Sequence, residues 1–341
     1  MGNVNLAKAK SSKFDEFYTQ YCDIEKEVNA YLEFNPNIFQ NKVILCPCDD
    51  PEWSNFTKYF AQNFERFKLK KLISTSFAFK NKDGKGKHFI LDKDINNDQK
   101  INIDDLNYKY LNGDGDFRSK EVTELRNEAD FIITNPPFSL FREFLDWIME
   151  AKKQFLIIGN VNNVTYKEVF PLIKKNMIWL GTKSTSKAMF FKTSDKEYAS
   201  RVSSQKPEGS WWRKIDGEIC IGINNSCWFT NLDHGRRHQP LSLMSLKDNL
   251  KFHNQMKKKK AYEKYDNYDA IEVPFTKAIP SDYEGKMGVP VSFLDKYNPE
   301  QFEIIGIDRY VKDNPHYGKR FTINNKEKYA RILIKHRKIK D

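Results

Sequence analysis

The tetrapeptide Asn135-Pro136-Pro137-Phe138 directly follows the apolar run 130–134, which is typical of a buried strand. Open parallel sheets bind ligands at the carboxyl ends of their strands, so we expect chemistry at this position. The Asn135 carboxamide oxygen and the Pro136 carbonyl oxygen can both accept hydrogen bonds from an amino group. The two prolines stiffen the loop, and Phe138 offers a ring face on which a planar base can stack.

These residue types suit the activation of an exocyclic amino group such as N6 of adenine. That nitrogen is a poor nucleophile because its lone pair is delocalised into the ring. Two acceptors would pull it toward tetrahedral geometry and hold it in line with a methyl group on a sulfonium. The pattern therefore indicates that Asn135, Pro136, Pro137 and Phe138 are catalytic. The same four residues also suit a rigid turn between a strand and a helix, so the tetrapeptide alone leaves both interpretations open.

The elements that would position this loop follow an α/β pattern. Short apolar runs alternate with helical periodicity, which is typical of a doubly wound, mostly parallel sheet. Ser54 is expected to cap a helix that reaches Phe64, and a second helix is expected from Leu140 to about Lys152. The expected strands lie at 42–46, 71–77, 130–134 and 154–159, with shorter ones at 177–180, 189–191 and 219–223.

The pattern changes near Asn231, where we place a domain boundary. Residues 1–231 form the expected catalytic domain, with an irregular polar insertion at about 81–109. Residues 232–341 form the expected target-recognition and C-terminal region, since their first part is rich in His, Lys, Arg and Tyr. The residues of this region that we expect to contact DNA phosphates are Arg236, Arg237, Lys257 and Lys258.

Composition limits the class of protein. The net charge of +11 favours a polyanionic partner, because each neutralised phosphate releases a counterion; the alternative is that the charge only keeps the protein soluble. Five cysteines do not suggest a disulfide framework, so we expect reduced thiols. No apolar run approaches the ~18 residues of a membrane span. We therefore expect a soluble, cytoplasmic protein with no membrane partner.

One segment has the spacing of calcium ligands. Oxygen-bearing side chains recur along 94–105, but Gln99 stands where the sharp turn needs Gly, and Asp105 stands where Glu is usual. A polar surface loop is the favoured interpretation of this segment. The Cys and His residues lack the spacing of a zinc site, so we expect no metal.

Beyond the tetrapeptide, the sequence resembles the EcoRI-type adenine-specific DNA methyltransferases. These belong to the amino-methyltransferases, whose signature is Asn/Asp-Pro-Pro-aromatic. The resemblance is dense from about Asp15 to Asn160 and looser after that. It implies a Rossmann-like, S-adenosylmethionine-dependent methyltransferase fold with a basic target-recognition region. The residues that carry it are Asn135–Phe141, Asp15–Glu25, Cys48–Pro51, Ser54–Phe56, Lys58–Ala61, Asn63-Phe64 and Leu69–Ile73.

The resemblance also implies S-adenosylmethionine as the cofactor. Phe17, Tyr18 and Thr19 match the family element that cradles its methionine end. A hydroxyl there can donate to the methionine carboxylate while an aromatic ring faces the sulfonium. By analogy with family members, Asp116 and Phe117 are expected at the cofactor adenine.

The loop after the first strand is the second part of the expected cofactor site. Asp49 or Asp50 is expected to accept from the methionine ammonium, although either can instead cap the following helix. Cys48 belongs to the same loop. The wider family has a glycine-rich turn here, but Pro47 to Pro51 contains no Gly, a departure that the EcoRI-type group shares.

The resemblance implies methylation of adenine N6 in double-stranded DNA, at a base flipped out of the helix. It further implies a short palindrome such as GAATTC and a cognate restriction endonuclease. We expect a monomer, since a monomeric enzyme can modify one strand at a time. The same tetrapeptide serves enzymes that methylate RNA adenine or protein glutamine. The charge disfavours the protein substrate, and the EcoRI-type residues disfavour RNA. A third alternative is a DNA-binding protein with a decayed catalytic half, against which the intact tetrapeptide and Phe17–Thr19 argue.

Overall fold

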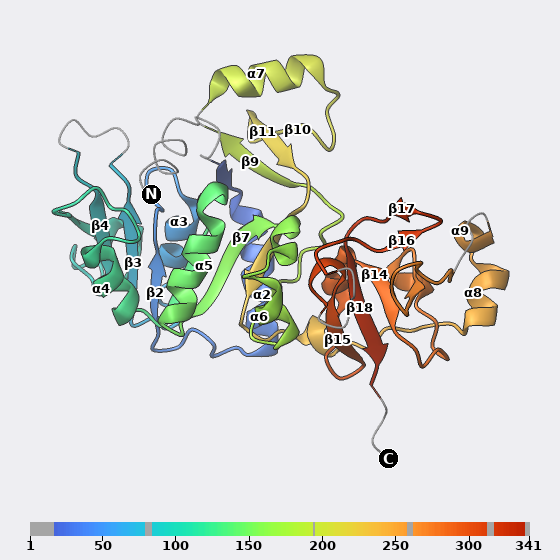
Figure 1. Ribbon diagram of the computed structural model, residues 1–341. Coiled ribbons are helices and arrows are strands. Elements are labelled where there is room, and N and C mark those ends of the chain that lie inside the picture. The colour runs from blue at the N-terminus through green and yellow to red at the C-terminus, as the bar shows by residue number, and fades with distance from the viewer. Residues whose placement is uncertain (1–16, 79–83, 194, 258–261, 312–316, 338–341) are drawn as a thin grey trace. The chain divides into compact units, whose positions relative to one another are not determined.

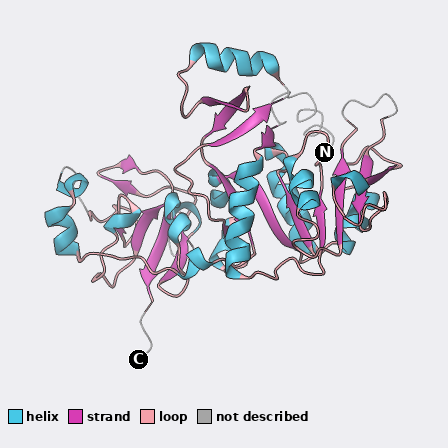
Figure 2. Ribbon diagram, turned by 180° about the vertical axis from the view of Figure 1, so that it is seen from behind, coloured by secondary structure: helices cyan, strands magenta, loops and turns pink. Residues whose placement is uncertain are grey.

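The computed structural model describes residues 17–78, 84–193, 195–257, 262–311 and 317–337 (Figures 1 and 2). The chain divides into two compact units. Unit 1 comprises residues 1–160 and 181–233, and unit 2 comprises residues 161–180 and 234–341. Both contain helices and strands, as the expected α/β class requires.

Unit 1 is built on a large mixed sheet. Its strands lie in the order β5-β4-β3-β2-β6-β7-β12. The four neighbours β3, β2, β6 and β7 are parallel, whereas β4, β5 and β12 pair antiparallel. The bounds are β2 Val43–Cys46, β3 Lys71–Ser76, β4 Lys87–Leu91, β5 Asn107–Tyr110, β6 Phe131–Thr134, β7 Gln154–Asn160 and β12 Ser226–Thr230.

Two expectations about this sheet need correction. A mostly parallel sheet was predicted, but only its four central strands are parallel to one another. The polar stretch 81–109 was predicted to be irregular, but it contains β4 and β5, which extend the sheet at one edge. In β4 only Phe89 and Leu91 are buried, and every residue of β5 is exposed. These edge strands therefore lack the apolar runs by which the buried strands were recognised.

Helices cover both faces of this sheet (Figures 1 and 2). α2 (Tyr21–Phe34) and α3 (Asn55–Gln62) share one hydrophobic core with β2, β6 and β7. The strand residues of that core alternate along the chain, so their neighbours face α4 (Lys120–Glu128) and α5 (Phe141–Glu150). As predicted, Ser54 caps α3, with its hydroxyl oxygen accepting from the Phe56 amide at 3.1 Å.

A second, antiparallel sheet in unit 1 carries the first described residues. Its strand order is β1-β9-β11-β10, and the helix α7 (Lys196–Gln205) follows β9. The register places Phe17 opposite Thr193 and Thr19 opposite Phe191. The bounds are β1 Phe17–Thr19, β9 Met189–Thr193, β10 Trp212–Ile215 and β11 Glu218–Ile223.

Unit 2 has a four-stranded sheet with the order β13-β14-β18-β15 and a separate hairpin, β16–β17. None of the helices within the described ranges is long and apolar enough to cross a membrane. The bounds are α6 Phe170–Lys174, β8 Trp179–Leu180, α8 Leu246–Phe252, α9 Asn254–Lys257, β13 Ile271–Glu272, β14 Met287–Pro290, β15 Phe302–Ile307, β16 Thr322–Ile323, β17 Lys326–Glu327 and β18 Arg331–His336.

Candidate active site

Asn135 follows the carboxyl end of β6, where the sequence placed it. Its side-chain nitrogen donates to the Phe17 carbonyl oxygen at 2.7 Å. A carbonyl oxygen only accepts, so Phe17 determines which end of the carboxamide faces β1. The other end, Oδ1 of Asn135, is buried and has no hydrogen-bond partner among the described residues. Such an oxygen costs about 1–3 kcal/mol unless a donor reaches it, so it is suited to accept from an incoming amino group.

An aromatic cluster borders this loop. The Phe138 ring lies 6.2 Å from the Phe17 ring and 6.3 Å from the Phe191 ring, measured between centroids. Phe17 and Phe191 complete the cluster at 5.9 Å. The structure therefore joins the Asn-Pro-Pro-Phe loop to the predicted cofactor element. Sequence reasoning recognised Phe191 only as part of a short strand; its pairing with Thr19 across β1 and β9 was not visible in the sequence.

The loop after β2 is tied to the strands on both sides. The Thr134 hydroxyl donates to the Pro47 carbonyl oxygen at 2.8 Å, and the Cys48 amide donates to the Thr75 hydroxyl oxygen at 3.1 Å. Cys48 has a φ of 65°, the left-handed conformation that favours glycine. The turn thus keeps a backbone that glycine would suit, although the residue is Cys. Burial raises the pKa of the Cys48 thiol to about 12, so the thiol remains protonated at neutral pH.

Asp49 and Asp50 differ in what their carboxylates contact. The Ser54 hydroxyl donates to Oδ1 of Asp49 at 2.6 Å, while Oδ2 of Asp49 is buried without a partner among the described residues. Oδ1 of Asp50 accepts from the Glu52 amide at 2.9 Å and so stabilises the turn before α3. Burial raises the pKa of Asp49 to about 7, against the opposing effect of the Ser54 hydrogen bond. A bound cation beside Asp49 would favour its ionised form.

β1 is held at two alternate carbonyl groups. Asn135 donates to Phe17, and Nδ2 of Asn55 donates to the Thr19 carbonyl oxygen at 2.7 Å. The Thr19 hydroxyl oxygen is buried and has no partner in the described part of the chain. Asn55 was missed by sequence reasoning, because an Asn at the first turn of a helix is more often read as part of the cap. Tyr18, between the two, is half-buried.

The predicted adenine-binding pair lies in a different setting. The Arg118 guanidinium donates to both carboxylate oxygens of Asp116, at 3.0 and 2.8 Å. Phe117 is buried, with its ring 4.9 Å from Phe144 and 5.5 Å from Trp147. Burial raises the pKa of the Cys48 thiol most, and the charges of Asp49 and Asp116 raise it further. Contact of Asp116 and Phe117 with a cofactor stays a prediction.

The predicted phosphate contacts belong to unit 2. Arg236 is half-buried, whereas Arg237 is buried with its guanidinium 3.5 Å from the Trp179 ring centroid and donating to Asn176 at 2.5 Å. Arg237 therefore has a packing role, and its contact with DNA stays a prediction. Lys257 ends α9, but its side chain is not described, and Lys258 lies outside the described residues.

The calcium-like loop 94–105 hydrogen-bonds to itself. Oδ1 of Asp105 accepts from the Ile95 and Asn96 amides at 2.8 and 3.2 Å. Its Oδ2 accepts from the Asn102 amide at 3.1 Å. These backbone hydrogen bonds lower the pKa of Asp105. In the described ranges no group of three or more His, Cys, Asp or Glu side chains could hold a metal ion.

Unit 1 is an α/β unit with an Asn-Pro-Pro-Phe loop at the end of a strand, and Oδ1 of Asn135 in that loop is a buried acceptor with no partner among the described residues. These are the features of an amino-methyltransferase. The comparisons with known proteins define the family. The family described as adenine-specific methyltransferase EcoRI matches residues 5–337, so the chain belongs to it. This confirms the resemblance and the predicted class of enzyme.

Curated relatives match over nearly their whole length. The type II methyltransferase M.EcoRI of Escherichia coli is 44% identical, over 99% of this chain and 98% of its own. M.MpnI of Mycoplasma pneumoniae is 34% identical over 97% of each chain. M.MgeORF184P of Mycoplasma genitalium is 35% identical, over 97% of this chain and 98% of its own. No solved structure matches the chain.

Proposed function

We propose that this enzyme transfers a methyl group from S-adenosylmethionine to N6 of a flipped adenine in double-stranded DNA. The observation that carries the proposal is the orientation of Asn135. Its nitrogen is held by Phe17, so its buried oxygen is left to accept from the substrate. Family membership supports adenine as the target, and the type II names of the relatives support DNA within restriction-modification.

The fold supports this assignment. The four parallel strands at the centre of the large sheet end at the loops that carry Asp49 and Asn135. A Rossmann-like methyltransferase binds its cofactor at that edge. We propose that the antiparallel strands β4, β5 and β12 are additions to such a core.

The residues present fit S-adenosylmethionine, which supplies a methyl group on a positively charged sulfur. Oδ2 of Asp49 is a buried acceptor to which no group in the described ranges donates, so it can accept from the methionine ammonium. The Thr19 hydroxyl is buried without a partner among the described residues and can donate to the methionine carboxylate. The Phe17 ring can face the sulfonium, since an aromatic face attracts a cation.

Catalysis is then mostly a matter of orientation. The Asn135 and Pro136 oxygens would accept hydrogen bonds from the two N6 hydrogens, and Phe138 would stack on the base. S-adenosylmethionine, when bound, would supply the methyl group on its sulfonium, and Asn135 and Pro136 would orient the N6 lone pair to receive it. The positively charged amine loses one proton to solvent. We propose direct transfer, with no covalent intermediate on the protein.

We further propose a domain organisation, a target sequence and an oligomeric state. Residues 1–231 serve as the catalytic domain and 232–341 as the target-recognition and C-terminal region. The identity of 44% to M.EcoRI supports a short palindrome such as GAATTC, with a cognate endonuclease that cuts the same site. We propose a monomer, which can modify one strand at a time.

A labelling assay tests the function. Purified protein and methyl-labelled S-adenosylmethionine are incubated in three separate reactions, one with duplex DNA, one with RNA and one with a protein extract. The expected result is label in N6-methyladenine from duplex DNA, lost in Asn135→Ala. Label in RNA or glutamine, with none in DNA, would overturn the proposal in favour of the alternatives. Binding to DNA without any transfer would indicate the non-catalytic alternative.

A further inference from the structure

We propose that the β16–β17 hairpin reads a base pair of the DNA target, with Asn324 and Asn325 as the reading side chains. This inference rests on the proposed function, because it assigns an element of unit 2 to recognition of the substrate. The hairpin was not recognised in the sequence, and it is separate from the four-stranded sheet of that unit (Figure 1).

The tip of the hairpin is a two-residue turn. Ile323 pairs with Lys326, so Asn324 and Asn325 alone connect the strands. Both have left-handed backbones, with φ of 52° and 60°, as the two central residues of a type I′ hairpin turn require. Both side chains are exposed. The turn therefore presents two neighbouring carboxamides at the end of a narrow antiparallel ribbon.

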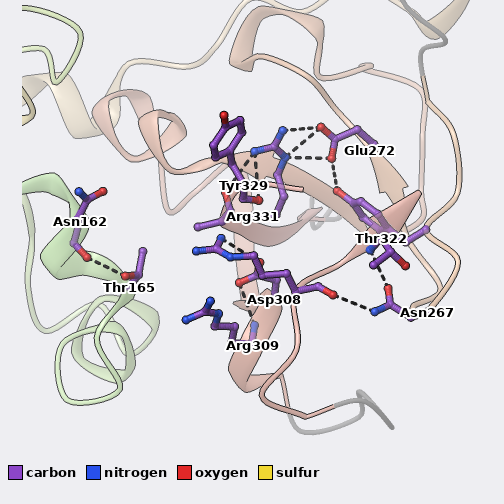
Figure 3. Close-up of polar contacts among 12 residues, drawn as sticks. Asn162, Thr165, Asn267, Glu272, Asp308, Arg309, Thr322, Tyr329 and Arg331 are labelled. Atoms are coloured by element: carbon purple, nitrogen blue, oxygen red, sulfur yellow. Dashed lines mark hydrogen bonds and ion pairs between the residues drawn. The ribbon is translucent and has the colours of Figure 1, made fainter. Parts of the chain in front are cut away.

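Asp266 and Asn267 hold the backbone of the hairpin by hydrogen bonds. The amides of Asn324 and Asn325 donate to the two carboxylate oxygens of Asp266, at 3.2 and 2.9 Å. These bonds lower the pKa of Asp266, so the anchor is ionised at neutral pH. The Asn267 side chain donates to the Arg320 carbonyl and accepts from the Thr322 amide, just before and within β16 (Figure 3). A fixed backbone lowers the entropic cost of binding by the tip.

The chain leaving the hairpin is anchored as well. Arg331 forms a buried ion pair with Glu272, with Nη2 2.6 Å from Oε1 and Nε 2.9 Å from Oε2 (Figure 3). The same guanidinium donates to the Ala330 carbonyl at 3.3 Å. Just ahead, Tyr329 is 87% exposed. A single exposed aromatic side chain is ordinary on a protein surface, so Tyr329 by itself indicates no partner.

The sequence segment that contains the hairpin is basic. From Asp308 to Arg337 it has nine Lys and Arg residues against three Asp and Glu. Arg331 among them is paired with Glu272, which lies outside the segment, so the net surplus is five. Arg309, Lys319 and Lys326 are exposed, and Tyr317 is 64% exposed. Such a surface suits phosphates on either side of a groove.

The chemistry of the tip favours double-stranded DNA. The major groove admits a two-stranded ribbon, and an Asn carboxamide can donate to N7 and accept from N6 of the same adenine. Lysines beside the tip would hold the ribbon on phosphates without reading sequence. The hairpin thus combines a side chain that distinguishes bases with a basic surface that fixes its position.

The test compares sequence preference. The double variant Asn324→Gly/Asn325→Gly keeps the left-handed backbone and removes only the carboxamides. Wild type and variant are assayed on duplexes in which each position around the methylated adenine is substituted in turn. We expect kcat/KM on the preferred sequence to fall about tenfold or more, and discrimination to weaken at one or two base pairs while other positions keep theirs. Binding of S-adenosylmethionine should be unchanged.

Two controls keep the test sharp. Asn41→Gly changes an exposed Asn with a φ of 57° that precedes β2, at the amino ends of the parallel strands and not at the carboxyl ends where Asn135 lies. This variant should leave the DNA sequence preference unchanged. Asn324→Asp and Asn325→Asp keep the shape, and a carboxylate that accepts from cytosine should shift the preference toward C·G at the affected pair. An unaltered preference in all these variants would overturn the inference. So would an equal loss of rate on every sequence. If wild type itself does not methylate DNA, the proposed function fails instead.

Discussion

Nδ2 of Asn135 donates to the Phe17 carbonyl oxygen at 2.7 Å across 118 positions of sequence. The donor belongs to the catalytic loop and the acceptor to the strand proposed to hold the cofactor. One hydrogen bond therefore sets the position of the substrate acceptor relative to β1. Because Asn55 holds the same strand at Thr19, the two asparagines allow the roles of orientation and support to be separated.

We expect Asn135→Ala to lower kcat by about 10²–10³, the usual effect of removing a preorganised polar group from a transition state. Asn55→Ala also removes a hydrogen bond to β1 but leaves the Asn135 oxygen in place. It should raise KM for S-adenosylmethionine more than it lowers kcat. Steady-state kinetics on duplex DNA would show the difference. Equal effects of the two variants on kcat would contradict the role given to Asn135.

Asp49 should make cofactor binding depend on pH. Its pKa of about 7 means that the carboxyl is half ionised near neutrality, and only the ionised form attracts an ammonium. Affinity for S-adenosylmethionine should therefore increase from pH 6 to pH 8 and level off above that. Calorimetric titrations over this range would measure it. A pH-independent affinity would argue against contact between Asp49 and the ammonium.

Asp49 should also make stability depend on pH, and its contribution to stability should decrease as the pH rises. The unfolded pKa is about 3.9, and the folded pKa is raised to about 7, so folding favours the protonated form. The contribution of Asp49 to stability is thus full below about pH 4 and is lost as pH rises toward 7. Asp49→Asn should make the protein without cofactor more stable than wild type at pH 8, as thermal unfolding would show, while weakening cofactor binding.

Cys48 should tolerate glycine better than a branched residue. At a φ of 65°, a side chain costs about 1 kcal/mol that glycine avoids. Cys48→Gly should therefore keep the free energy of unfolding within about 1 kcal/mol and retain activity, whereas Cys48→Val should lose both. Urea unfolding and turnover provide the measurements. Loss of activity in the glycine variant, with stability intact, would instead show that the thiol side chain itself is needed.

Local sequence patterns predict some features of this structure and miss others. Buried parallel strands and the capped helix α3 follow from local patterns, so β2, β6 and the place of Asn135 were predicted correctly. β4 and β5 were missed because edge strands exposed to solvent carry little hydrophobic signal. The bond from Asn55 to Thr19 depends on chain pairing over a long range, which no local pattern encodes. The φ of Cys48 likewise appears only in the fold, since the usual glycine is absent.

Arg236 and Arg237 are neighbours in sequence with different surroundings, and this makes them a matched pair. Arg237 is buried between the Trp179 ring and Asn176, so Arg237→Ala should cost about 2 kcal/mol of folding free energy through lost packing and hydrogen bonding. Arg236 is only half-buried, so Arg236→Ala should lower the melting temperature less than Arg237→Ala does. If Arg236 contacts a phosphate, its loss should weaken binding to all duplexes alike and reduce the slope of log K against log salt by about one. Fluorescence anisotropy at several salt concentrations, beside thermal unfolding, distinguishes the two. A steeper or unchanged salt slope in Arg236→Ala would remove this residue from the DNA interface.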